Sequence, residues 1–188
     1  IMFLSNRNYN KELKDFKSRI LDEIVILLYH GVTSSESEGI ENYSGKHISN
    51  DVFAKQMNYI SKNCNPISMN EYLHFVENGY DMPPSSVIIS FDDGFKNNFS
   101  VAAPILEEFN IPAIFYVSSG IVNTDLMFWV DIIEDCLNKS KVNKFEIKLS
   151  KVEKFVFDNN RQKINAVEKI KQYCKSCNFI ELKRVLND

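Results

Sequence analysis

The sequence lacks any long apolar stretch and any excess of positive charge. Its longest plainly apolar run is Ile24 to Leu28, which is far too short to cross a bilayer. No basic region followed by an apolar stretch marks a signal peptide near Ile1. The formal net charge is -3 over 188 residues, whereas nucleic-acid-binding proteins usually carry a strong basic patch. We therefore expect no membrane span and no nucleic-acid partner.

Cysteine is scarce as well. The four cysteines are too few and too scattered for a disulfide framework. Cys174 and Cys177 have the spacing of half a zinc site, but no second pair of ligands lies near them in the sequence. We expect them to be helix residues without a chemical role.

The last third of the chain contains neither glycine nor proline. All six glycines fall at or before Gly120, and all five prolines fall at or before Pro112. Without these helix breakers, residues 121–188 are predicted to be helical. The net charge also changes, from -9 over residues 1–140 (10 basic, 19 acidic) to +6 over residues 141–188 (12 basic, 6 acidic). The basic tail is either a solvated helical surface or an element that faces an acidic partner.

Three short apolar runs are predicted to be buried strands of a parallel sheet. Each is a continuous β-branched or aromatic run without alternation, which is typical of strands covered on both faces. The runs are Ile24–Tyr29, Val87–Phe91 and Ala113–Val117. The pattern of strands separated by helices predicts an α/β fold.

Helix signals lie between and after these runs. The predicted boundaries are a cap at Asn50 or Asp51, a capping box from Ser68 to Glu71 with an end at Gly79, a helix over Asn97–Phe109 that kinks or restarts at Pro104, and a second capping box from Ser150 to Glu153.

Polar residues follow each predicted strand, and the sharpest signal is the pair Asp92 and Asp93. Adjacent carboxylates repel each other unless something compensates, and a divalent cation is the usual partner. One acid could then bind a metal while the other accepts a proton from bound water. Gly94 would let the backbone turn behind them. The alternative is a plain turn with solvated carboxylates.

The surrounding residues carry a family resemblance. The sequence runs Ser90-Phe91-Asp92-Asp93-Gly94-Phe95, then Ala103-Pro104-Ile105-Leu106, then Ile111 to Val117. This pattern closely resembles the NodB-type polysaccharide deacetylases, with their T/S-F-D-D-G motif, their alanine-proline-isoleucine-leucine helix and their I-P-A-T-F-F-V strand. Tyr29-His30-Gly31-Val32 is similar to a strand-end motif of many members, and Trp129 and Asp131 resemble an aromatic-acidic element.

The resemblance implies a distorted (β/α) barrel and a hydrolase that removes acetyl groups, commonly N-acetyl, from a polysaccharide or oligosaccharide. Carried over, Asp92 is the general base and Asp93 a ligand of a divalent metal, zinc, while His30 and Trp129 lie near the substrate. The expected domains are a helical lead-in over 1–23, the first part of the barrel over 24–135, and a Lys-rich helical insertion or extension over 136–188.

The histidines depart from the family pattern. Members complete the metal site with an H-S/T-x-x-H motif, but His30, His47 and His74 include no pair with that spacing. We expect the missing motif to lie beyond Asp188; the competing interpretation is that the protein has lost its metal. His30 could contact metal or substrate, or be structural, and for His47 and His74 packing or solvent contact is favoured.

Two other functions stay open at this stage. One is a catalytically inactive carbohydrate-binding or scaffold protein, and the other is a metal-dependent hydrolase of a non-sugar amide. An incomplete barrel would leave apolar strand edges exposed, which is compatible with a homo-oligomer. The localisation is left open: the family analogy favours the bacterial cell envelope or the extracellular space, and the lack of a visible signal peptide keeps the cytoplasm as an alternative.

Overall fold

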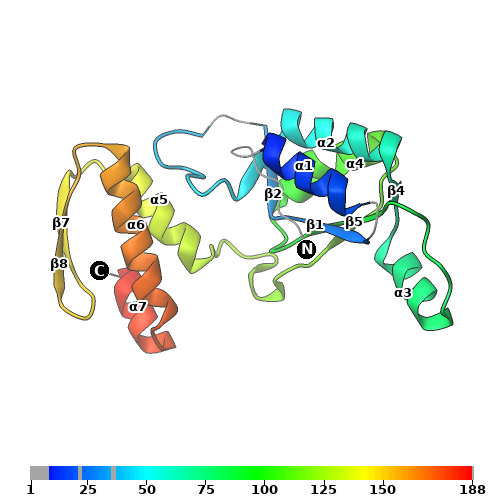
Figure 1. Ribbon diagram of the computed structural model, residues 1–188. Coiled ribbons are helices and arrows are strands. Elements are labelled where there is room, and N and C mark those ends of the chain that lie inside the picture. The colour runs from blue at the N-terminus through cyan, green and yellow to red at the C-terminus, as the bar shows by residue number, and fades with distance from the viewer. Residues whose placement is uncertain (1–8, 21–22, 35–36, 188) are drawn as a thin grey trace. The chain divides into compact units, whose positions relative to one another are not determined.

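The computed structural model describes residues 9–20, 23–34 and 37–187, which divide into two compact units (Figure 1). The first unit comprises Ile1–Glu36 and Ser44–Val122, and the second comprises Ser37–Tyr43 and Asn123–Asp188. The predicted lead-in contains α1 (Tyr9–Arg19), while residues 1–8 and 21–22 lie outside the described part.

The first unit holds a parallel sheet with helices between its strands. Its sheet strands are β1 (Val25–Tyr29), β4 (Asn65–Pro66), β5 (Ser86–Phe91) and β6 (Ala113–Phe115). A separate pair is formed by β2 (Gly31–Thr33) and β3 (His47–Ser49). The helical elements are α1, α2 (Asn50–Asn63), α3 (Met69–Asn78), a π-helical turn η1 (Asn98–Ala102), α4 (Ala103–Glu108) and a 3-10 turn η2 (Ser119–Ile121).

Strand β5 is the centre of this sheet, and all of its pairings are parallel. It pairs with β1 from Val25↔Val87 to Tyr29↔Phe91. Its other edge pairs with β4 near its start and with β6 near its end, where Phe91 aligns with Phe115. The carboxyl ends of β1, β5 and β6 therefore lie side by side.

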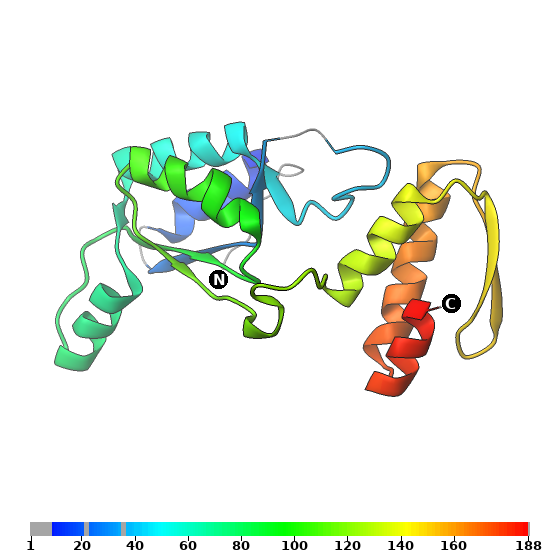
Figure 2. The same ribbon diagram turned by 180° about the vertical axis from the view of Figure 1, so that it is seen from behind.

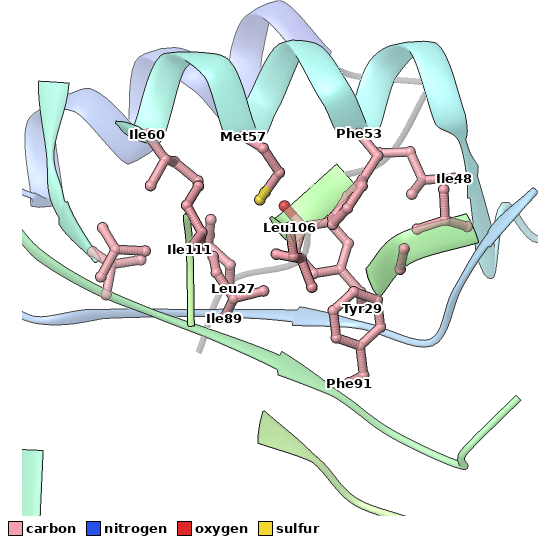
Figure 3. Packing of buried hydrophobic residues seen from close by; sticks show 14 of the residues in the cluster. Leu27, Tyr29, Ile48, Phe53, Met57, Ile60, Ile89, Phe91, Leu106 and Ile111 are labelled. Carbon is pink, nitrogen blue, oxygen red and sulfur yellow. The ribbon is translucent and has the colours of Figure 1, made fainter. Parts of the chain in front are cut away.

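The main core lies between this sheet and one layer of helices. In both ribbon views α1, α2 and α4 lie over the same face of the sheet (Figures 1 and 2). Helix α2 directs Phe53, Met57 and Ile60 toward Leu27 and Ile89 of the strands, and all five are buried (Figure 3). Each such side chain stabilises the fold by about 1.5–3 kcal/mol when it leaves water.

The three predicted strands are confirmed, but only one of them is covered on both faces. All six residues of β5 are buried, whereas β1 alternates between buried and half-buried residues and β6 ends with the exposed Phe115. The mixed α/β class is confirmed. Within the described residues the sheet is open, with no second partner along β1 or β6, so these residues form no closed barrel.

Local helix signals match the structure closely. Ser68 caps α3 through a reciprocal capping box with Glu71, and Gly79 ends the helix with φ 66°. Pro104 lies in the first turn of α4, so a new helix begins there directly after η1. Helix α2 differs by one residue from the prediction, because Ser49 is its N-cap.

The second unit contains α5 (Trp129–Lys139), a hairpin of β7 (Lys144–Lys148) and β8 (Val152–Val156), α6 (Asn160–Lys175) and α7 (Phe179–Asn187) (Figure 1). The all-helical tail and the capping box at Ser150–Glu153 were therefore wrong. Phe145 and Ile147 alternate with exposed residues, and Phe145 stacks on Phe155 of the opposite strand at 5.2 Å between ring centroids. The alternation of buried and exposed side chains is typical of strands. The lack of glycine and proline, on which the helix prediction was based, does not reveal this alternation.

A second core holds this unit together. Val167 and Ile170 of α6 pack with Ile147 of the hairpin and Ile133 of α5. Lys171 pairs with Glu134 at 3.0 Å, with both side chains largely shielded from solvent.

Across the described part of the chain, no helix is both long enough and apolar enough to cross a membrane.

Candidate active site

The three parallel strand ends bring the predicted site residues of the first unit together. Tyr29, Phe91 and Phe115 are aligned in register, and their rings stack in a row, at 5.4 Å from Tyr29 to Phe91 and 4.8 Å from Phe91 to Phe115. Figure 3 shows Tyr29 and Phe91 at this end of the core. The next residue along β1 is His30, and the next along β5 is Asp92.

The backbone around Asp92 and Asp93 is held on both sides. The Asp92 amide donates to the Tyr29 carbonyl at 2.9 Å, which extends the β1 pairing by one residue. On the other side, the Ser118 amide donates to the Asp93 carbonyl at 3.4 Å. The acid pair is therefore fixed between the chain that leaves β1 and the chain that leaves β6.

Two successive residues of this turn are left-handed. Asp93 has φ 72° and Gly94 has φ 75°. A side chain at Gly94 would be strained by that φ, and its Cβ would lie only 2.8 Å from Val117 Cγ1. The prediction that Gly94 lets the chain turn behind the acids is thus confirmed. A left-handed aspartate is uncommon, and such strain collects at functional sites.

Both acid side chains are partly exposed, so solvent and small molecules can reach them. No group of three or more His, Cys, Asp or Glu side chains that could hold a metal occurs in the described ranges. The residues described here thus fit part of a metal site and not a complete one, because a catalytic zinc typically has about three protein ligands.

The two residues predicted to lie near the substrate fall in different units. His30 is half-buried and connects β1 to β2, beside the acid pair. Trp129 is the first residue of α5, and it packs against the core of the second unit. Its role at the site stays a prediction, while its packing matches the alternative of a core residue.

His47 and Asn97, which no sequence motif singled out, are brought into contact by the fold. His47 lies opposite Gly31 in the β2–β3 pair, and its Nδ1 lies 2.9 Å from Asn97 Nδ2. Asn97 follows Gly94 by only three residues, so this contact involves the loop that leaves the acid pair. This contact could not be predicted, because strands as short as β2 and β3 carry no periodic signal. The two residues that it joins are also 50 positions apart in the sequence.

Comparisons with known proteins agree with the motif. Poly-beta-1,6-N-acetyl-D-glucosamine N-deacetylases from several Staphylococcus aureus strains, among them N315 and COL, are 31% identical to this chain over 100 residues. The chain is homologous to polysaccharide deacetylases over about half of its length. The match covers 53% of this chain but only 33% of those relatives, so the chain spans about a third of their length. No family model matches the sequence.

Two solved deacetylase structures are among those found to be similar to part of this chain. IcaB from Ammonifex degensii is 27% identical with a TM-score of 0.48, covering 60% of this chain and 48% of that chain. The Streptococcus pyogenes deacetylase PplD, in complex with acetate, is 22% identical with a TM-score of 0.47, covering 59% and 50% respectively.

Proposed function

We propose that this chain carries the acid pair of a hydrolase that removes N-acetyl groups from a glycan. The observation that supports the proposal is the position of Asp92 and Asp93, which follow a fully buried strand in a strained turn whose backbone is held from both sides. The homology to polysaccharide deacetylases supports the same reaction.

The reaction is the hydrolysis of an acetamide. Water adds to the acetyl carbon, the bond between carbon and nitrogen breaks, and acetate and a protonated amine leave. Asp92 accepts the proton of the attacking water and passes it to the leaving nitrogen as the bond breaks, which requires its carboxylate to lie about 2.6–3.2 Å from that water. A carboxylate that is partly exposed at the end of a rigid strand is suited to this role.

Asp93 is the residue that we assign to a divalent cation, zinc. When bound, such an ion would polarise the acetyl carbonyl and lower the pKa of its water. The described residues offer only part of a ligand set for this ion. His30 follows β1 as Asp92 follows β5, and we propose that it contacts the substrate.

The substrate class that we propose is an acetylated polysaccharide or oligosaccharide. The S. aureus relatives are named for poly-beta-1,6-N-acetyl-D-glucosamine, so β-1,6-linked N-acetylglucosamine oligomers are the first compounds to test. A stacking role of Trp129 on a sugar ring belongs to this proposal, since aromatic faces pack well against apolar surfaces.

We also propose that the sheet is part of a distorted (β/α) barrel, with residues 24–135 as its first part and 136–188 as an inserted or appended element. The free side of β6 supports this, because Phe115, Tyr116 and Val117 are exposed there. A cavity of about 510 Å³ beside β6, lined by Leu106, Ile111 and neighbouring residues, leaves room for further packing. Self-association through this edge would cover the same residues.

Acetate release by the full-length protein tests the proposed function. We expect release from N-acetylglucosamine oligomers, with an increase when zinc is added to metal-depleted protein, and little release from simple non-sugar amides. Asp93→Asn should weaken zinc binding measured by calorimetry, and Asp81→Asn, an exposed aspartate outside the site, should not. Oligomer binding without any acetate release would instead support an inactive carbohydrate-binding protein.

A further inference from the structure

The pairing of β3 with β2 places His47 beside the chain that leaves β1. Strand β3 begins at His47 and runs parallel to β2, with His47 opposite Gly31, the residue after His30. The loop that follows the acid pair returns to the same place, where Asn97 meets the His47 ring. Two segments that are 50 residues apart therefore touch beside the chain that leaves β1.

The contact joins Asn97 Nδ2 to His47 Nδ1 at 2.9 Å, and the amide N–H can donate to this ring nitrogen when the nitrogen carries no proton. The Phe95 ring packs edge-on against the His47 ring, with 4.8 Å between centroids. Lys46 Nζ lies 4.4 Å from the centre of the Phe95 ring. His47 thus holds two residues of the loop at once.

The packing around this contact is tight. A Cβ at Gly31 would collide with the His47 ring and would lie 2.6 Å from Asn97 Oδ1. Asn97 Oδ1 is buried and finds no hydrogen-bond partner among the residues that the structure describes. Gly31, His47 and Asn97 therefore pack so closely that a side chain at Gly31 would displace this contact.

We propose that His47 is a positioning residue for the acid pair, acting through Asn97 and Phe95. The backbone of the acid pair is held by the Tyr29 carbonyl and the Ser118 amide, and the His47 ring contacts Phe95 and Asn97 in the loop that follows. This inference rests on the proposed deacetylase function. It gives His47 no contact with substrate and makes it responsible for the orientation of Asp92 and Asp93.

Kinetics of His47 variants in the full-length protein test the inference. We expect His47→Ala to lower kcat for acetate release by about tenfold or more while KM changes little, because misplaced reacting groups slow the chemical step. His47→Asn should restore most of the rate, since its amide oxygen can accept from Asn97 in place of Nδ1. The matched control is His74→Ala, which removes an exposed histidine of α3.

Asn97→Ala removes the Asn97 partner of the same contact, and it replaces His47→Ala in the test if that variant does not fold. In the double variant we expect a rate loss close to that of either single variant, because both remove one interaction. A folded His47→Ala or Asn97→Ala protein that keeps the wild-type kcat would overturn the positioning role. So would a variant that is only less stable, with an unchanged rate per folded molecule.

Amide hydrogen exchange gives a readout that needs no activity. We expect faster exchange at Asp92 to Phe95 in His47→Ala, because only this variant loses the contacts of residue 47 with Phe95 and Asn97. Exchange in His47→Asn and His74→Ala should match the wild type. Unchanged exchange in His47→Ala would contradict the inference. If the wild-type protein releases no acetate, the proposed function fails, and the exchange comparison still decides whether His47 holds the turn.

Discussion

Asp93 and Gly94 adopt the same left-handed backbone conformation, but only glycine does so without strain. For a residue with a side chain this conformation costs about 1–3 kcal/mol and persists only where neighbouring contacts enforce it. Here the Asp92 amide and the Asp93 carbonyl are both hydrogen-bonded to flanking chains. At the residue scale, the site therefore depends on backbone contacts as much as on the two carboxylates.

Replacing Gly94 by alanine should destabilise the first unit by about 2 kcal/mol or more, since it adds a left-handed strain and a clash with Val117. Urea unfolding measures this loss. Gly45→Ala is the matched control, because Gly45 has a similar φ of 73° but nothing within 4 Å of its added Cβ. Equal losses in both variants would contradict the role given to the Val117 contact.

Glu181 should make the second unit sensitive to acid. Hydrogen bonds from Arg184 and from the Tyr173 hydroxyl lower the pKa of Glu181 from 4.5 to about 2. A lowered pKa in the folded state means that the stabilisation is present above pH 4.5 and is lost as the pH falls toward 2. Between pH 6 and 3, the thermal unfolding temperature should fall less steeply with pH in Glu181→Gln than in the wild type. The control, Glu168→Gln, should show the same pH dependence as the wild type.

At the element scale, α3 is held mainly by its ends. None of its described residues is buried, and the capping box of Ser68 and Glu71 closes its first turn. Ser68→Ala should therefore cost about 1 kcal/mol of local stability and speed amide exchange within α3. Ser61→Ala, an exposed serine of α2, is the control and should leave α3 exchange unchanged. A global loss of stability with uniform exchange would argue against local opening.

The elements that the sequence predicted are those with strong local signals. β5 contains a run of apolar residues interrupted only by Ser90, and α3 carries both a capping box and a terminal glycine. The β7–β8 hairpin was missed because its alternation is short and lies in a Lys-rich stretch that lacks the usual turn residues. The acid pair was visible because its two residues are neighbours in sequence, whereas the contact of His47 with Asn97 depends on how β2 and β3 pair.

At the scale of the whole molecule, two hydrophobic cores divide the chain. One core contains Leu27, Phe53 and Ile89, and the other contains Val167 and Ile170. This division could not be predicted from breaker residues or charge, because Ser37–Tyr43 belongs to the second unit although it lies early in the sequence.

The two cores can be tested separately with the single tryptophan, Trp129, which packs in the second unit. Ile170→Ala should destabilise that unit by about 3 kcal/mol and lower the urea midpoint of the Trp129 fluorescence change. Ile60→Ala, a substitution of the same kind in the first core, should move this midpoint much less. Equal shifts would mean that the two units unfold as one.

The proposed function depends most directly on Asp92, to which we assign the proton transfer of glycan deacetylation. The most direct test is kcat for acetate release from N-acetylglucosamine oligomers by full-length Asp92→Asn, compared with Asp81→Asn at equal folded concentration. We expect Asp92→Asn to lose about 10²–10⁴-fold and Asp81→Asn to match the wild type. A folded Asp92→Asn protein that deacetylates at the wild-type rate would contradict the claim.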